Sequence, residues 1–289
     1  MKTVYYLTRR NSKLFFKDKG MFFSSLITPI ILLVLYVTFL AKIYRDSFAS
    51  AVPAGLVSDS LIDATVAAQL ISSLLAVICV TVAFCANLIS INDKASGAIR
   101  DLTVTPVRRS ALAGGYFASS AIVTLIVTVT TLAVCLIYLA VIGWYMSVGD
   151  VFLLLLDVLL LTLFGTALAS CVNFGLSTNG QASAVGTIVS AGYGFICGAY
   201  MPISSFGTGL QRVLSFLPGT YGTCLLRNHA MAGVLREMRD TAGFPEEVLT
   251  GIRDSVDCNL SFFGTQVTVP AMYLILSGAT LLLVGVYIL

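Results

Sequence analysis

Charge-free apolar stretches follow one another along most of the chain, separated by short charged segments. A helix needs about 20 apolar residues to cross the hydrocarbon core of a bilayer, so each stretch can hold at least one span and the fourth can hold two. The pattern predicts six membrane-spanning helices. The charge-free stretches are residues 20–41, 64–92, 110–149, 158–211 and 258–289.

All six spans are expected to be helical, including the third, although its residues 122–129 would favour a strand in water. Lipid offers no partners for backbone amides, so helix formation outweighs this β-propensity. Pro29 predicts a kink in the first span. We place the spans at residues 21–41, 66–91, 117–142, 151–172, 182–200 and 268–289.

Two further helical regions flank the spans. Residues 1–19 mix apolar with basic side chains, which is typical of an amphipathic helix lying on the inner leaflet with its lysines toward lipid phosphates; the alternative is an ordinary positive flank. Residues 201–267 separate the last two spans. Their apolar spacing predicts a short helix ended by Pro218 and a pair of charged helices broken near Gly243, forming an outer helical cap.

Composition strengthens the membrane assignment. The chain has 57% hydrophobic residues, 11% charged residues and a mean hydropathy of +0.94. A water-soluble core of this size could not hide so much apolar surface. The sequence therefore predicts a single transmembrane domain of the all-α integral membrane class, covering residues 1–289.

The distribution of charge predicts which side of the membrane each loop faces. The N-terminus and residues 92–109 and 173–181 carry ten Lys and Arg against three Asp. The opposite loops, residues 42–63, 143–150 and 201–257, carry seven Lys and Arg against ten Asp and Glu. Because basic residues in short loops stay cytoplasmic, we expect both termini in the cytosol and the protein in the cell membrane.

Residues 92–109 form a compact charged segment between the second and third spans. Gly97 permits a sharp bend, and Pro106 stops a helix before two arginines at the inner surface. A short rigid segment gripped by two spans is suited to dock into a cytosolic partner. The residues that we expect to act in coupling are Asp93, Gly97, Arg100, Asp101, Leu102, Thr105 and Pro106.

Small and polar side chains mark faces of other spans. A stripe that includes Gln69, Ser73 and Asn87 shares one face of the second span and serves either helix packing or a substrate path. Asp157 in the fourth span suggests proton or cation chemistry, or contact with interfacial water. Small residues at four-residue steps in the fifth span are typical of close helix packing: Gly186, Ser190, Gly194 and Gly198.

The sequence offers no set of residues for catalysis or metal binding. It lacks the glycine-rich phosphate loop that ends in Gly-Lys-Ser or Gly-Lys-Thr. The single histidine, His229, cannot build a zinc site and is interpreted as a surface or interface residue. Cys224 and Cys258 share the outer region, where a disulfide is one possibility. The basic residues lie beside the membrane, so no nucleic-acid binding is expected.

Three groups of residues, spread over nearly the whole chain, carry a resemblance to a known family. The first is Arg10-Asn11 with Phe16-Lys17-Asp18 and Pro29. The second runs from Asp93 through Gly97 to Leu102-Thr103-Val104-Thr105-Pro106. The third is Gly198-Ala199-Tyr200-Met201-Pro202, followed by Leu217-Pro218-Gly219-Thr220-Tyr221 and Leu226-Arg227. Together they resemble the transmembrane subunit of type-2 ATP-binding-cassette (ABC) exporters, in which the position of Asp93 is more often glutamate.

The resemblance implies a dimer of six-span subunits, identical or different, each bound to a separate ABC ATPase that binds ATP and magnesium. No cofactor is then expected in this chain. The N-terminal helix and residues 93–106 would pass nucleotide-driven motion to the spans, and the outer helices would form a gate. Spans two and five would line a path between the subunits, with Gln69, Ser73, Asn87, Asn173 and Tyr193 as path residues.

The expected function is export of an amphipathic or lipophilic substrate, such as a drug, peptide or lipid-linked molecule. One alternative is a stand-alone six-span immunity or lipid-scaffolding protein without an ATPase. Another is an ion-coupled transporter that uses Asp157. Three observations distinguish these functions. An exporter subunit depends on an ATPase partner, a stand-alone protein functions without nucleotide, and an ion-coupled transporter loses transport on Asp157→Asn without depending on ATP.

Overall fold

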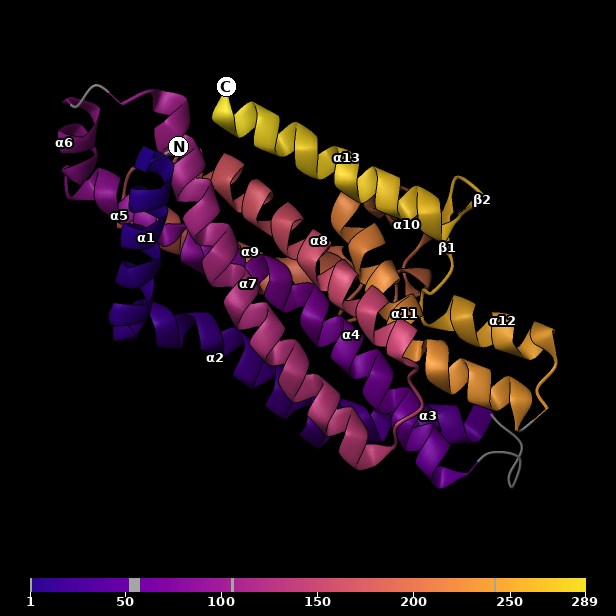
Figure 1. The fold of residues 1–289 in the computed structure, drawn as a ribbon. Coiled ribbons are helices and arrows are strands. Elements are labelled where there is room, and N and C mark those ends of the chain that lie inside the picture. Colours follow the sequence, from indigo (N-terminus) through magenta and orange to yellow (C-terminus); the bar gives the residue numbers. More distant parts are fainter. Residues whose placement is uncertain (1, 52–57, 105–106, 242) are drawn as a thin grey trace.

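The computed structural model describes residues 2–51, 58–104, 107–241 and 243–289. It is a bundle of long helices with one short β-hairpin, which confirms the all-α membrane class (Figure 1). The first half comprises α1 (Lys2–Lys17), α2 (Lys19–Leu35), a π-helical segment (Tyr36–Leu40), α3 (Ala41–Ala51), α4 (Asp59–Ala86), α5 (Leu88–Ala95), α6 (Ala98–Val104) and α7 (Arg109–Ile142). The second half comprises α8 (Val148–Phe174), α9 (Asn179–Ile196), a 3-10 turn (Ile203–Ser205), α10 (Thr208–Leu214), α11 (Pro218–Asp240), α12 (Glu246–Ser255), β1 (Leu260–Phe262), β2 (Thr265–Val267) and α13 (Val269–Ile288).

Five helices of the described chain are long and apolar enough to cross a membrane. They correspond to the first, second, third, fourth and sixth predicted spans. The fifth predicted span is helical as α9, but its many small and polar residues make it less apolar, and it is not among the five. The count of six spans stays a prediction. The five helices run over Lys19–Asp46, Asp59–Ala95, Arg109–Ile142, Val148–Phe174 and Val269–Ile288.

The first and third spans show how the local sequence acts inside a helix. α2 continues through Pro29 to Leu35, and the departure from α-helical geometry comes only afterwards, in the π-helical segment. α7 is helical throughout, as the need to satisfy backbone groups in lipid requires. Its hydroxyls at Thr124 and Thr130 donate to carbonyls one turn earlier, so neither presents an unsatisfied donor to the apolar surroundings.

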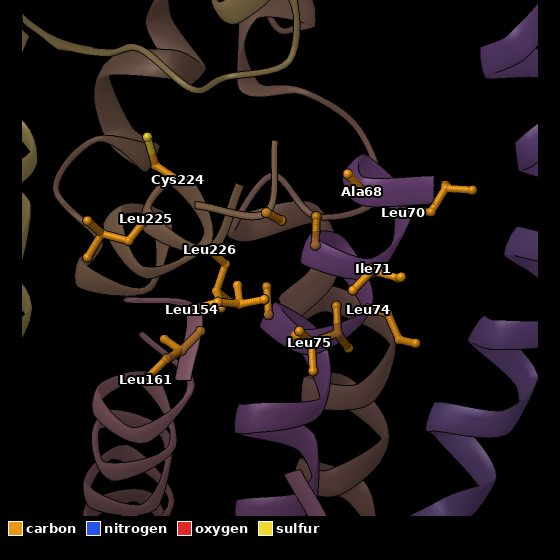
Figure 2. Packing of buried hydrophobic residues seen from close by; sticks show 14 of the residues in the cluster. Ala68, Leu70, Ile71, Leu74, Leu75, Leu154, Leu161, Cys224, Leu225 and Leu226 are labelled. Carbon is orange, nitrogen blue, oxygen red and sulfur yellow. The ribbon is translucent and has the colours of Figure 1, made fainter. Parts of the chain in front are cut away.

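α4 is the centre of the bundle, with α2, α7, α8, α9 and α11 packed around it. Its side chains are buried on nearly every face, as expected for a mainly apolar helix at the centre of a bundle. Figure 2 shows side chains of α4, α8 and α11 meeting in this core, among them Leu75, Leu154 and Leu226. α2, α7 and α13 instead expose many large apolar side chains, which suits helices that face lipid.

Residues 201–267 do not all lie beyond the ends of the spans. α11 is largely buried and packs beside α4, α8 and α13. Pro218 does not end the preceding helix, since α10 stops at Leu214; it opens α11, where a missing amide hydrogen costs nothing. The expected break near Gly243 is confirmed, because α11 ends before it, α12 begins after it, and Gly243 has a φ of +63°.

The two ends of the bundle carry different elements (Figure 1). The N-terminus, α6 and the C-terminal end of α13 lie at one end, and α3, α12 and the β-hairpin lie at the other. A ring contact between Phe174 and Tyr287, with 6.2 Å between centroids, holds the end of α13 beside the end of α8. Both chain termini are therefore on the same side of the bundle.

Glycines outside the predicted small-residue face set close approaches between helices of this chain. A Cβ atom on Gly165 of α8 would lie 2.6 Å from the Cys79 carbonyl oxygen of α4, and one on Gly222 of α11 would lie 2.5 Å from Leu161 of α8. In the predicted small-residue face, Gly186 faces open space and the Tyr200 ring of the same chain covers Gly194. The four-residue spacing of small residues shows that α9 has a narrow face, but it does not show what packs on that face. Gly198 follows the end of α9 and has a φ of +74°.

Candidate coupling site

α1 is docked on the protein through a buried carboxylate. Arg10 of α1 donates two hydrogen bonds to Asp93 of α5, at 2.6 and 3.1 Å, and the Tyr116 hydroxyl of α7 donates a third at 2.6 Å. Two-point arginine–carboxylate contacts combine charge with fixed geometry. The bond to Asp93 raises the pKa of the Arg10 guanidinium, which therefore stays charged. This cluster joins α1, α5 and α7.

Apolar contacts extend the docking of α1 along α7. Phe15 is fully buried, and Leu7 packs so closely over Gly115 that a Cβ atom there would lie 2.5 Å away. Asn11 donates to the Ser119 hydroxyl at 3.4 Å. The expected amphipathic helix is thus present, with its apolar face against protein. Contact of its lysines with lipid stays a prediction.

Lys94 links the same region to the turn between α8 and α9. Its Nζ atom donates to the carbonyl oxygens of Phe174 and Leu176, at 2.7 and 3.2 Å, and lies over the Phe174 ring. A cation is stabilised at a helix C-terminus, where carbonyls lack partners within the helix. The sequence analysis did not single out Lys94, although its place beside Asp93 in the charged segment was a usable signal.

α6 projects from this base at one end of the molecule (Figure 1). Gly97, with a φ of +82°, makes the turn between α5 and α6, which confirms the expected bend. Arg100 and Asp101 are exposed and Val104 is 86% exposed. Leu102 packs against the apolar cluster under α1 and lines a groove of about 480 Å³ between α1, α6 and α7. Two further expected coupling residues, Thr105 and Pro106, lie outside the described residues.

The expected path residues do not share one cavity. Ser73 accepts a hydrogen bond from Arg227, and Asn87 pairs with Ser170 of α8, so both make helix–helix contacts. Gln69 is buried in α4, which packs on every side. For Ser73 and Asn87, helix packing is the arrangement that the structure shows.

Two cavities hold the remaining path residues. Asn173 lines a groove of about 580 Å³ between α2, α4 and α9, together with Thr81, Gly186 and Ser190. Its Nδ2 atom is buried and has no hydrogen-bond partner in the described part of the chain. Tyr193 lines a separate cavity of about 540 Å³, almost entirely apolar, between α8, α9 and α13. The two cavities are lined by different residues of α9.

Comparison with known families decides the class of protein. The profile described as ABC-2 type transporter matches residues 2–229. The chain belongs to the ABC-2 type transporter family. It is therefore a multi-pass transmembrane subunit of an ABC transporter, of a family that typically works with an ATPase subunit. No curated protein matches the chain.

A buried arginine links several elements of this ABC-2 subunit that are far apart in the sequence, and its sequence neighbours do not predict this role. Arg227 of α11 is 1% exposed and donates to the carbonyl oxygens of Val256 and Gly198, each at 2.7 Å, and to Ser73 at 3.2 Å. Asp257 lies 3.5 Å from it. Arg227 entered the sequence analysis only through the family resemblance, because nothing near it in the chain signals burial.

The structure also places His229, Cys224 and Cys258. His229 lies at the interface of α8, α11 and α13: its side chain is 12% exposed and its Nδ1 atom lies 2.5 Å from Asp157, whose side chain is 1% exposed. Cys224 and Cys258 are free, buried thiols, and the Cys224 sulfur donates to the Cys258 carbonyl oxygen at 3.2 Å. Burial raises the pKa of the Cys258 thiol to about 12.

Proposed function

We propose that this chain is the transmembrane subunit of an ABC exporter of the cytoplasmic membrane. It moves an amphipathic or lipophilic substrate outward, using ATP and magnesium bound by a separate ATPase, and contributes no catalytic residue itself. The observation that carries the proposal is the exposed helix α6, standing on the Arg10–Asp93–Tyr116 cluster.

The contacts beneath α6 suit it to transmit motion from an ATPase to the membrane spans. α5 continues from α4 into the turn at Gly97, Asp93 ties α5 to α1 and α7, and Lys94 ties it to the end of α8. A force applied to α6 therefore reaches several spans through charged and packed contacts. An ATPase shifts the spans between two states only if its affinity for α6 differs between those states.

The groove between α2, α4 and α9 supports the second half of the proposal. Its walls combine apolar side chains with the hydroxyls of Thr81 and Ser190 and the unpaired amide of Asn173, which suits an amphipathic cargo. Gly186 leaves one side of the groove open. We propose that a second permease subunit, identical or different, covers this side.

The sidedness follows from charge. The end that carries α1 and α6 has the excess of basic over acidic residues, so we propose that this end faces the cytosol and that the exposed lysines of α1 contact lipid phosphates. Outward transport follows from the resemblance to exporters.

The test is purification of the tagged chain from its native membrane in mild detergent, with mass spectrometry and ATPase assay of what co-purifies. We expect a P-loop ATPase with the wild type, and its loss from a variant that carries Arg100→Ala and Asp101→Ala on α6. The matched control, Arg239→Ala with Glu246→Ala, removes an exposed ion pair between α11 and α12 and should keep the ATPase. A chain that stays alone after crosslinking at native expression would favour the stand-alone immunity or lipid-scaffolding function.

A further inference from the structure

A polar cluster lies where α8, α11 and α13 meet, apart from the coupling site. Asp157 of α8 is 1% exposed, and its Oδ2 atom lies 2.5 Å from Nδ1 of His229 on α11. The Tyr273 hydroxyl of α13 donates to the other carboxylate oxygen. The imidazole also stacks on the Tyr273 ring, with 6.3 Å between centroids. Three helices therefore meet on one carboxylate.

A neighbouring ion pair shows what is distinctive about this cluster. Asp150 lies about two helical turns before Asp157 in α8, and its partner Arg236 lies about two turns after His229 in α11. The two pairs thus join the same two helices at successive levels. Arginine carries its charge at every physiological pH, whereas the charge of histidine changes in that range.

The number of protons decides the charge of the buried cluster. When Asp157 is ionised, Nδ1 of His229 carries the proton of the hydrogen bond that joins them. With Nε2 unprotonated, the cluster has one net negative charge in apolar surroundings, which is unfavourable; with Nε2 protonated, it is neutral. The side chain of His229 is 12% exposed, so protons can reach it.

Other titratable groups do not replace this proton. The Cys79 thiol of α4 faces the Val158 carbonyl oxygen at 3.9 Å, beside Asp157. On α11, Arg227 points toward Ser73 and Gly198, and Arg236 points toward Asp150. On α13, the neighbouring group is Tyr273 itself. Within the described residues, no cation other than His229 pairs with Asp157.

We propose that Asp157, His229 and Tyr273 form a proton-binding site, in which Nε2 of His229 takes up the proton and the neutralised cluster strengthens the contact of α11 with α8 and α13. The site is independent of the proposed export function, since it requires neither an ATPase nor a substrate.

The single histidine of the chain makes the site directly observable. The protein, purified without a histidine tag and labelled in its imidazole nitrogens, is followed by NMR in lipid nanodiscs between pH 8.5 and 5. We expect Nδ1 to stay protonated throughout and Nε2 to become protonated as the pH falls. Asp157→Asn should shift the titration midpoint and free Nδ1, whereas Arg236→Gln should leave the spectrum unchanged. An unprotonated Nδ1, or equal midpoints in wild type and Asp157→Asn, would overturn the proposal.

Hydrogen exchange of α11 amides, corrected for the intrinsic effect of pH, tests the strengthened contact. We expect roughly tenfold slower exchange at pH 6 than at pH 8 in the wild type. His229→Gln keeps a donor for Asp157 but cannot titrate, so its exchange should not depend on pH; Arg236→Gln should behave like the wild type. If Asp157→Asn fails to fold, this comparison decides alone. Wild-type exchange that is equal at both pH values, or a pH dependence that persists in His229→Gln, contradicts the proposal.

Discussion

At the scale of residues, a few buried charged groups join distant parts of the chain. Asp93 collects donors from α1 and α7, and Arg227 collects acceptors from α4, from the end of α9 and from the segment after α12. A charge is tolerated in such surroundings only when it is paired and hydrogen-bonded. These contacts therefore place whole helices relative to one another, and their loss has effects beyond the residue itself.

Replacing Asp93 by asparagine removes the ion pair but keeps the shape of the side chain. Hydrogen bonds to charged groups contribute about 1.5–3 kcal/mol, and the side chain of Arg10 is 39% exposed, so we expect a loss of about 1–2 kcal/mol and a melting temperature lower by a few degrees. Stimulation of the partner ATPase by the permease should fall several-fold. Asp93→Glu, which restores the carboxylate, is the control; equal defects in both variants would argue against a role of the charge.

At the scale of elements, the space beside a glycine decides how closely another helix packs there. Gly165 of α8 lies against the backbone of α4, where an added Cβ atom would meet the Cys79 carbonyl oxygen and the Val80 Cα atom. Gly186 of α9 has open space beside it. The α4–α8 contact is thus a tight pair within one chain, whereas the Gly186 face of α9 is left uncovered.

Matched alanine substitutions at these two glycines should have opposite effects. Gly165→Ala must push α8 from α4, and overpacking of this kind costs about 1–3 kcal/mol. Gly186→Ala meets nothing among the described residues, so in the separated subunit it gains helix propensity, up to about 1 kcal/mol. Thermal unfolding of both purified variants beside the wild type checks this. Equal destabilisation by the two substitutions would contradict the packing described for α8.

At the scale of the whole molecule, the bundle has two chemically distinct ends. α1, α6 and the chain termini share one end, and α12 and the β-hairpin lie at the other (Figure 1). The charge distribution of the loops predicts that the first end faces the cytosol. Because α6 and α12 stand at opposite ends, their exposed residues report the orientation of the protein in the membrane.

Cysteine labelling with a membrane-impermeant maleimide measures this orientation. We expect Thr250→Cys on α12 to react from outside intact cells, and Val104→Cys on α6 to react only after permeabilisation. Wild type should stay unlabelled in the outer region: the pKa of Cys258 is raised to about 12, so its reactive thiolate is nearly absent at pH 7.4 and forms only as the pH approaches that value. Labelling of both introduced cysteines from the same side would overturn the two-ended arrangement.

The sequence by itself determined the membrane class, the helical spans around α2, α4, α7, α8 and α13, and the charged segment with its bend at Gly97. Length without charge and the need to satisfy every backbone amide in lipid are local properties, so they can be read along the chain. Only the tertiary structure decided which residues meet: Ser73 with Arg227, Asp157 with His229, and Gly165 with α4. A polar stripe such as that of Ser73 on α4 marks a face that meets protein but not its partner, and partners far apart in sequence are chosen only when the helices pack.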